Sequence, residues 1–176
     1  MRTIFIIGTM HTMMPEHAQE LELLFTVMNP DVLFIEVLPE DVKKENFKDY
    51  PSEMTYAYVL ARKFEKKVFG FDTDVDVVNL TLPTDERKKI DEEMAHIVAA
   101  ANWKEFNKID SELYKKLSVL TEKCIDVDKD RQRHMGMLGN IEKNMPAHGK
   151  VLILTGSFHL PFFREHIKGA LFPLER

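Results

Sequence analysis

Short apolar segments alternate with longer amphipathic ones in the first and last parts of the chain. Residues 3–7, 32–35, 67–71 and 151–155 are mainly apolar and rich in β-branched or aromatic side chains, which is typical of strands buried on both faces of a parallel sheet. In the segments between strands, apolar residues recur at spacings of three and four after helix-start signals. The pattern predicts an α/β fold, with a mainly parallel sheet of at least four strands flanked by helices.

The middle of the chain interrupts this alternation. From residue 83 to residue 120, the apolar positions keep helical spacing without any strand-like run. We predict two long helices packed as a hairpin, with a break near Asn102 and inserted at about 83–124 into a single α/β domain of 1–176. A further helix is predicted over 126–144, and we expect its inward stripe to consist of Val127, Met135, Leu138 and Ile141.

Composition narrows the classes of function. The 176 residues are 44% hydrophobic and 30% charged, which is enough apolar material for one core. The net charge of -5 argues against nucleic-acid binding. The single cysteine, Cys124, excludes an internal disulfide and a cysteine-rich zinc site, so any metal site would use histidines and carboxylates. The apolar run near the N-terminus is too short for a signal peptide or a membrane span, so we predict a cytoplasmic protein without a membrane partner.

Two strand-like segments end in the same short motif. Gly8-Thr-Met-His11 follows the first strand, and Gly156-Ser-Phe-His159 follows the last. One such match is weak, but two in equivalent positions are harder to attribute to chance. A glycine allows a sharp exit from the sheet, so the histidine three residues later can turn back across the end of the strand.

Two carboxylates occupy comparable positions, because Glu36 follows the second strand and Asp72 follows the third. The carboxyl ends of parallel strands share one edge of a sheet, where ligands bind. We therefore expect Glu36, Asp72 and both histidines to converge, although each alone could be an ordinary polar residue or helix cap. Arg131 lies on the predicted inward stripe and is expected to face these carboxylates or a bound anion, with a structural salt bridge as the alternative.

We expect Arg133 and four further histidines to have no role in the site. Arg133 is expected to point to the opposite, solvated face of its helix. Surface or loop positions are expected for His17, His134 and His148, and a structural role for His96.

The combined motifs resemble the TraB/PrgY and TIKI group, in a superfamily that includes the erythromycin esterases and the ChaN-like haem-binding proteins. The similar features are the two Gly-x-x-His motifs, Glu36 in Phe-Ile-Glu-Val, and Asp130-Arg131 on a late helix. Asp130, Gln132 and Val37 stand where glutamate, asparagine and leucine are common. The resemblance implies a hydrolase-like site, since TIKI relatives are described as metal-dependent proteases and the esterases open a lactone.

The leading hypothesis is a hydrolase acting on a small-molecule or peptide substrate. In its metal version, a divalent cation (Mn, Zn, Co or Fe) is bound by His11, Glu36, Asp72 and His159, with the backbone of Gly8 and Gly156 beside the cofactor. In its metal-free version, a histidine oriented by Glu36 acts as general base and Arg131 stabilises the developing oxyanion.

Two alternatives remain. One is a binding protein that holds a metal, haem or a small anionic molecule without turnover. The other makes the helical hairpin a surface for a partner or for a second copy of the chain, giving a homo-oligomer.

Overall fold

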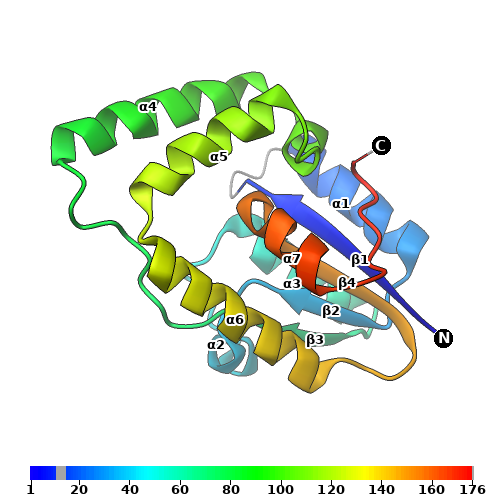
Figure 1. Cartoon of the computed structure of the whole chain (residues 1–176). Coiled ribbons are helices and arrows are strands. Elements are labelled where there is room, and N and C mark those ends of the chain that lie inside the picture. Colours follow the sequence, from blue (N-terminus) through cyan, green and yellow to red (C-terminus); the bar gives the residue numbers. More distant parts are fainter. Residues whose placement is uncertain (11–14, 176) are drawn as a thin grey trace.

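The first and last strands of the chain are neighbours in one parallel sheet (Figure 1). The structure is a computed structural model that describes residues 1–10 and 15–175, with the backbone alone for residues 15 and 16. Within this part of the chain, four parallel strands lie in the order β1–β4–β2–β3. They are β1 (Arg2–Thr9), β2 (Val32–Ile35), β3 (Lys67–Gly70) and β4 (Gly149–Gly156). The predicted parallel sheet is confirmed, and each strand is found where the apolar pattern placed it.

The register of β1 and β4 places Gly8 and Gly156, the first residues of the two motifs, within one position of each other at the carboxyl ends of their strands. Gly8 is opposite Thr155, and Thr9 is opposite Gly156. Because β4 inserts between β1 and β2, its carboxyl end adjoins both the first motif and the loop that follows β2. Residues that are far apart in the sequence therefore meet at one edge of the sheet.

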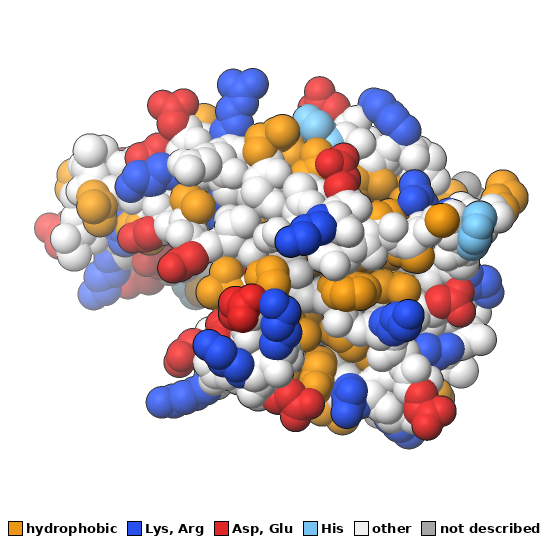
Figure 2. Space-filling model, turned by 90° about the horizontal axis from the view of Figure 1, so that it is seen from below, with side chains coloured by type: hydrophobic (Ala, Val, Ile, Leu, Met, Phe, Trp, Pro, Cys, Tyr) orange, Lys and Arg blue, Asp and Glu red, His pale blue; other side chains and the backbone are white. Residues whose placement is uncertain are grey.

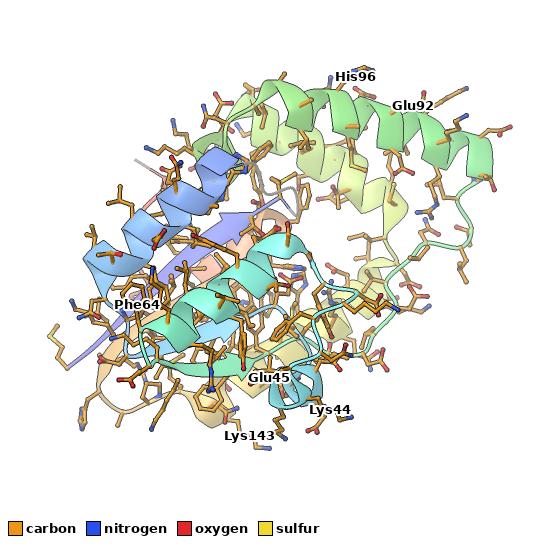
Figure 3. All side chains as sticks on the ribbon, turned by 180° about the vertical axis from the view of Figure 1, so that it is seen from behind. Lys44, Glu45, Phe64, Glu92, His96 and Lys143 are labelled. Carbon is orange, nitrogen blue, oxygen red and sulfur yellow. The ribbon has the colours of Figure 1, made fainter. Side chains whose placement is uncertain are left out.

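Helices cover both faces of the sheet. Helices α1 (Pro15–Met28) and α3 (Ser52–Lys63) cover one face, seen from behind in Figure 3. Helices α6 (Val127–Asn144) and α7 (Leu160–His166) cover the other (Figure 1). Alternate side chains of each strand point to opposite faces, so Leu33 packs with the α1 and α3 layer while Phe34 packs with the α6 and α7 layer. The double burial explains why the strands are apolar throughout.

The predicted helical hairpin is confirmed. It consists of α4 (Thr84–Ala100), the 3-10 helix η1 (Trp103–Asn107) and α5 (Glu112–Cys124). The break at Asn102 is stabilised by a capping box, in which the Asn102 side chain accepts the Glu105 N–H and the Glu105 carboxylate accepts the Asn102 N–H. Figure 3 shows His96 and Glu92 on the outer side of α4, and His96 is exposed.

The hairpin is anchored to the ends of β1 and β4. The Asn107 amide accepts the N–H of Gly8 at 2.8 Å and donates to its carbonyl at 3.0 Å, and Trp103 Nε1 donates to the same carbonyl at 2.6 Å. The Tyr114 hydroxyl donates to the carbonyl of Ser157 at 2.9 Å. Buried amide groups need such partners, so the insertion provides hydrogen bonds that the sheet itself does not supply there.

Two details of the helices differ from the sequence predictions. A short helix, α2 (Pro39–Lys44), lies in the polar stretch after β2, where no helix was predicted. In α6, Leu138 and Ile141 are buried as predicted, but Val127 is 66% exposed and Met135 is 53% exposed. The buried stripe instead consists of His134, Met137, Leu138 and Ile141, which have the same helical spacing in a different phase. The contact of α6 with the sheet sets this phase, and the helix sequence alone does not reveal it.

The surface carries mixed charge. On the face shown in Figure 2, Lys and Arg side chains are interspersed with Asp and Glu, with hydrophobic side chains between them. Exposed ion pairs such as Lys63–Glu22, at 3.1 Å, contribute little to stability. None of the described helices combines the length and apolar character that a membrane-spanning helix needs.

Replacing Gly8 by alanine is expected to lower the free energy of unfolding by about 1–3 kcal/mol, because overpacking strains a close contact. A Cβ at this position would lie 2.8 Å from the Cα of Ser157 and 2.8 Å from the Leu160 side chain. Gly139 is the matched control, since an added Cβ there meets nothing within 4 Å, and Gly139→Ala should raise stability by about 0.5–1 kcal/mol. Urea denaturation measures both; equal stability of Gly8→Ala and the wild type would contradict the close packing of the two motifs.

Candidate functional site

The polar side chains that follow the strands form one cluster at the carboxyl edge of the sheet. Glu36 follows β2 directly, Asp72 lies two residues beyond β3, and His159 ends a 3-10 helix, η2 (Ser157–His159), that continues from β4. Glu36 and His159 are 6% and 7% exposed. The structure thus brings Glu36, Asp72 and His159 together, while His11 lies outside the described residues.

Arg133 links the two carboxylates. Its Nε and Nη2 atoms each donate to a different oxygen of Asp72 at 2.9 Å, and Nη2 also donates to Oε1 of Glu36 at 3.0 Å. Burial is the largest single influence on this guanidinium and lowers its pKa. The hydrogen bond to Asp72 and the negative charges of Glu36, Asp72 and Asp130 together outweigh burial, so the pKa of Arg133 is raised. Arg133 is therefore a permanent cation between two buried anions.

The predicted orientations of the two arginines are reversed. Arg131 is exposed and forms no ion pair with any described residue, whereas Arg133, expected on the solvated face, is bound to the carboxylates. The reason is the phase of α6, because the helix turns Arg133 and His134 toward the sheet rather than Arg131. The spacing of His134 from Met137, Leu138 and Ile141 is compatible with this phase, but the sequence alone does not select it.

Glu36 is held by protein donors on both oxygens. Oε2 accepts the Thr155 hydroxyl at 2.7 Å and the Gly156 N–H at 2.5 Å. Oε1 lies 3.2 Å from Nε2 of His159 in addition to its contact with Arg133. Such donors compensate a buried carboxylate for the loss of water. Thr155 was not singled out by the sequence, although it immediately precedes the second motif.

The two motif glycines use their backbone groups on the protein itself. The N–H of Gly8 donates to Asn107 and that of Gly156 donates to Glu36. Both glycines therefore help to position neighbouring protein groups. Their part in holding a cofactor stays a prediction.

A second histidine extends the cluster. Nδ1 of His159 lies 2.7 Å from Nε2 of His134, and Nδ1 of His134 lies 3.1 Å from Oδ2 of Asp130. His134 is 9% exposed and its ring stacks on Phe162 with centroids 4.6 Å apart. The expectation of a surface or loop position for His134 was wrong, because it belongs to the buried stripe of α6. The result is a continuous row of contacts, Asp130–His134–His159–Glu36.

Asp130→Asn is expected to destabilise the fold on the order of 1 kcal/mol near neutral pH, since it weakens a charge-assisted hydrogen bond. Burial is the largest influence and raises the pKa of Asp130, but the hydrogen bond and charge of His134, with the charges of His159 and Arg133, bring it below 3.8. A carboxylate with a lowered pKa contributes stability above its unfolded value, and that contribution is lost as pH falls through the folded value.

The difference in stability between the wild type and Asp130→Asn should therefore be constant above about pH 5 and shrink in more acidic solution. Urea denaturation across this range measures it. Asp128→Asn is the matched control, because Asp128 is exposed on the same helix. A difference that grows on acidification would contradict the assignment.

The cluster forms one end of a pocket of about 780 Å³ that is lined by residues of α5, α6 and α7. Glu36, Asp130, Arg133, His134 and His159 line it, and Arg131 lies on its α6 wall. The apolar part of the lining is formed by Val77, Ile125, Val127, Met135, Phe158, Pro161 and Phe162. The volume and the mixture of a polar end with apolar walls are typical of small-molecule sites.

The described residues contain no group of three or more His, Cys, Asp or Glu side chains arranged to hold a metal ion. The oxygens of Glu36 and Asp72 that face the cluster accept hydrogen bonds from Arg133, Thr155, Gly156 or His159. Since His11 lies outside the described residues, the metal site stays a prediction.

Comparisons with protein-family models, curated proteins and solved structures find no match to this chain. The resemblance to the TraB/PrgY and TIKI group therefore stays a prediction that depends on the short motifs. Of the two α6 residues that the resemblance selects, Asp130 contacts His134 and Arg131 lies on the pocket wall.

Proposed function

We propose that this chain is a hydrolase that cleaves an ester or amide bond in a small-molecule or peptide substrate without a metal ion. Glu36 and His159 transfer the protons, and Arg133 binds the negative charge of the intermediate. The observation that carries the proposal is the convergence of a carboxylate, two imidazoles and a guanidinium, all largely buried, at the polar end of one pocket.

Hydrolysis needs a group that takes a proton from water, a group that gives one to the leaving atom, and a donor for the oxyanion. Glu36 and His159 are 3.2 Å apart, so a proton can pass directly between them. Both side chains are shielded from bulk water. Electrostatic interactions are stronger in such a buried site than at an exposed surface. The cluster therefore contains the required acid and base in contact with each other.

Arg133 has one nitrogen left for a substrate oxygen. Nε and Nη2 hold the carboxylates, whereas Nη1 makes no hydrogen bond to a described residue. The side chain lines the pocket and is 18% exposed. A fixed guanidinium donor of this kind suits an oxyanion, since it needs little reorganisation during reaction. In the proposed mechanism, Arg133 therefore stabilises the oxyanion, the role that the sequence predicts for Arg131.

The apolar wall indicates the character of the substrate. Val127, Arg131 and Met135 follow one another at intervals of four on α6 and all three line the pocket. This stripe was predicted to face the protein core, yet in the structure it faces the pocket. It suits a substrate whose reacting carbonyl carries an apolar group.

A metal-dependent form of the reaction would need a different state of the cluster. A cation shared by Glu36 and Asp72 would have to displace Arg133, which already forms ion pairs with both carboxylates. For this reason we propose the metal-free form of the mechanism.

A binding protein without turnover is the second candidate. It is favoured by the fact that all four ring nitrogens of His134 and His159 contact protein atoms, so neither ring stands free as a base. In this reading the pocket holds a small ligand, and the cluster serves to fix the pocket wall.

Assays with a panel of nitrophenyl esters, peptides and phosphoesters distinguish the hydrolase from the binding protein. We expect turnover of esters or amides that carry an apolar acyl group, unaffected by a chelator. Ligands that raise the melting temperature without being cleaved, across all classes in the panel, would overturn the hydrolase and support the binding protein.

A further inference from the structure

We propose that the outer edge of β3 binds an extended, acidic peptide segment of another protein as an added strand of the sheet. The site is a groove of about 740 Å³ that is lined by residues of α2, the end of α3 and β3. It shares no lining residue with the pocket of the proposed hydrolase. The proposal therefore does not depend on that function.

The groove follows the edge of β3. This strand is the last in the sheet and pairs with β2 on one side only, and α2 packs beside it (Figure 3). Lys67, Val68 and Phe69 are consecutive residues of β3, and all three line the groove. Consecutive side chains of a strand point to opposite faces of a sheet. A groove that contacts all three therefore lies along the edge of the strand.

Val68 presents its backbone groups to this edge. The N–H of Phe71, just beyond β3, donates to the carbonyl of Ile35 on β2 at 3.1 Å. The backbone groups of alternate residues point to the same side of a strand, so those of Phe69 face β2 and those of Val68 face away from it. No strand of the described chain lies on that side of β3. The Val68 N–H and carbonyl can therefore bond to an incoming strand.

Basic side chains dominate the charged lining of the groove. The acids there are Glu45 and Glu65, and the bases are Lys43, Arg62, Lys66 and Lys67. Lys43 already forms an ion pair with Glu40, and Glu45 accepts the Tyr58 hydroxyl at 2.7 Å. The other three bases form no ion pair with a carboxylate of the described residues. The chain as a whole has a net charge of -5, so the groove is a basic region on an acidic protein.

These charges favour an acidic partner over a second copy of the chain. Lysines on an edge strand oppose pairing with an identical strand, because like charges would come together. An acidic strand would instead place carboxylates beside Arg62, Lys66 and Lys67. Its apolar side chains would contact Val42 and Phe69, which also line the groove. In strand addition of this kind, main-chain hydrogen bonds provide affinity and alternate side chains provide specificity.

Fluorescence anisotropy with labelled short peptides tests the charge of the partner. One probe alternates glutamate and valine, and its control has lysine in place of each glutamate. We expect the acidic probe to bind roughly tenfold or more tightly than the control, and its affinity to fall as salt is added. Equal binding of the two peptides would overturn the proposal. Tighter binding of a duplex oligonucleotide than of the acidic probe would also overturn it.

Methylated probes test the strand edge. Two versions of the acidic probe carry N-methyl groups on one or the other set of alternate residues. The version methylated on the set that faces β3 should bind roughly tenfold less tightly than the parent, because it has lost its donors to the edge, and the other should bind like the parent. The parent probe should also slow hydrogen exchange at the Val68 amide. Equal affinity of all three probes, or unchanged exchange at Val68, would contradict strand addition.

Charge reversal in the groove tests the place of binding. Lys67→Glu should weaken binding of the acidic probe roughly tenfold, because a like charge then faces the peptide. Lys88→Glu is the matched control, since Lys88 is an exposed lysine of α4 that does not line the groove. Its Kd should stay within about twofold of the wild type. Both changes are at exposed positions, and circular dichroism verifies that the variants are folded. Equal losses in the two variants would overturn the groove as the binding site.

Discussion

Arg133→Met is expected to lower the free energy of unfolding by about 3–5 kcal/mol, because it removes one partner of a buried charge network. The side chains of Glu36 and Asp72 are only 5% and 14% exposed, and each would lose its ion pair with Arg133 while staying buried. The methionine side chain has a similar reach and fills much of the same space, so most of the loss is electrostatic. Urea denaturation monitored by circular dichroism measures it.

Two further variants separate this effect from packing. Arg131→Met should change stability by no more than about 0.5 kcal/mol, since Arg131 is exposed and has no ion pair with a described residue. Combining Arg133→Met with Glu36→Gln and Asp72→Asn should recover much of the loss, because no uncompensated charge is then buried. A larger effect from Arg131→Met than from Arg133→Met would show that α6 has the phase predicted from its sequence.

Glu36→Gln is expected to reduce kcat/KM about 10²- to 10⁴-fold on any ester or amide that the protein cleaves, the range typical of a group that transfers a proton. Glutamine keeps the size of the side chain and an oxygen for Thr155 and Gly156, but it cannot accept a proton from water. Steady-state kinetics with the substrate found in the panel measures the effect.

The control for this variant is Glu142→Gln, which changes an exposed glutamate on α6 away from the pocket. Its kinetics should match those of the wild type. The kinetics of Glu36→Gln and of the wild type are compared at a temperature where both are folded, because Glu36 also accepts a hydrogen bond from the end of β4. Full activity in folded Glu36→Gln would exclude the proposed mechanism.

Much of the fold is predictable because the relevant signals are local. A run such as Val32–Ile35 must be buried on both faces, and that requires a sheet with helices on either side. The hairpin is predictable for the same reason, including its break at Asn102, which the structure shows as a capping box. Helix α2 was not predicted, because its six residues contain a single buried apolar side chain, Val42.

The candidate site is predictable only in part. Glu36, Asp72 and His159 could be selected because parallel strands place their carboxyl ends on one edge, whatever the order of the strands. The choice between Arg131 and Arg133 could not be made, since both positions lie within one turn of α6 and only its contact with the sheet decides which points inward. His134 was missed for the same reason.

The sequence by itself determined the alternation of strands and helices, the inserted hairpin and the acids and histidines at the strand ends, because hydrophobic period and chain direction are local properties. Tertiary structure alone decided that β4 lies between β1 and β2, that Arg133 and not Arg131 forms ion pairs with Glu36 and Asp72, and that His134 contacts His159. The strand order and the rotation of α6 against the sheet both depend on contacts between residues distant in the chain, which no local pattern of the sequence specifies.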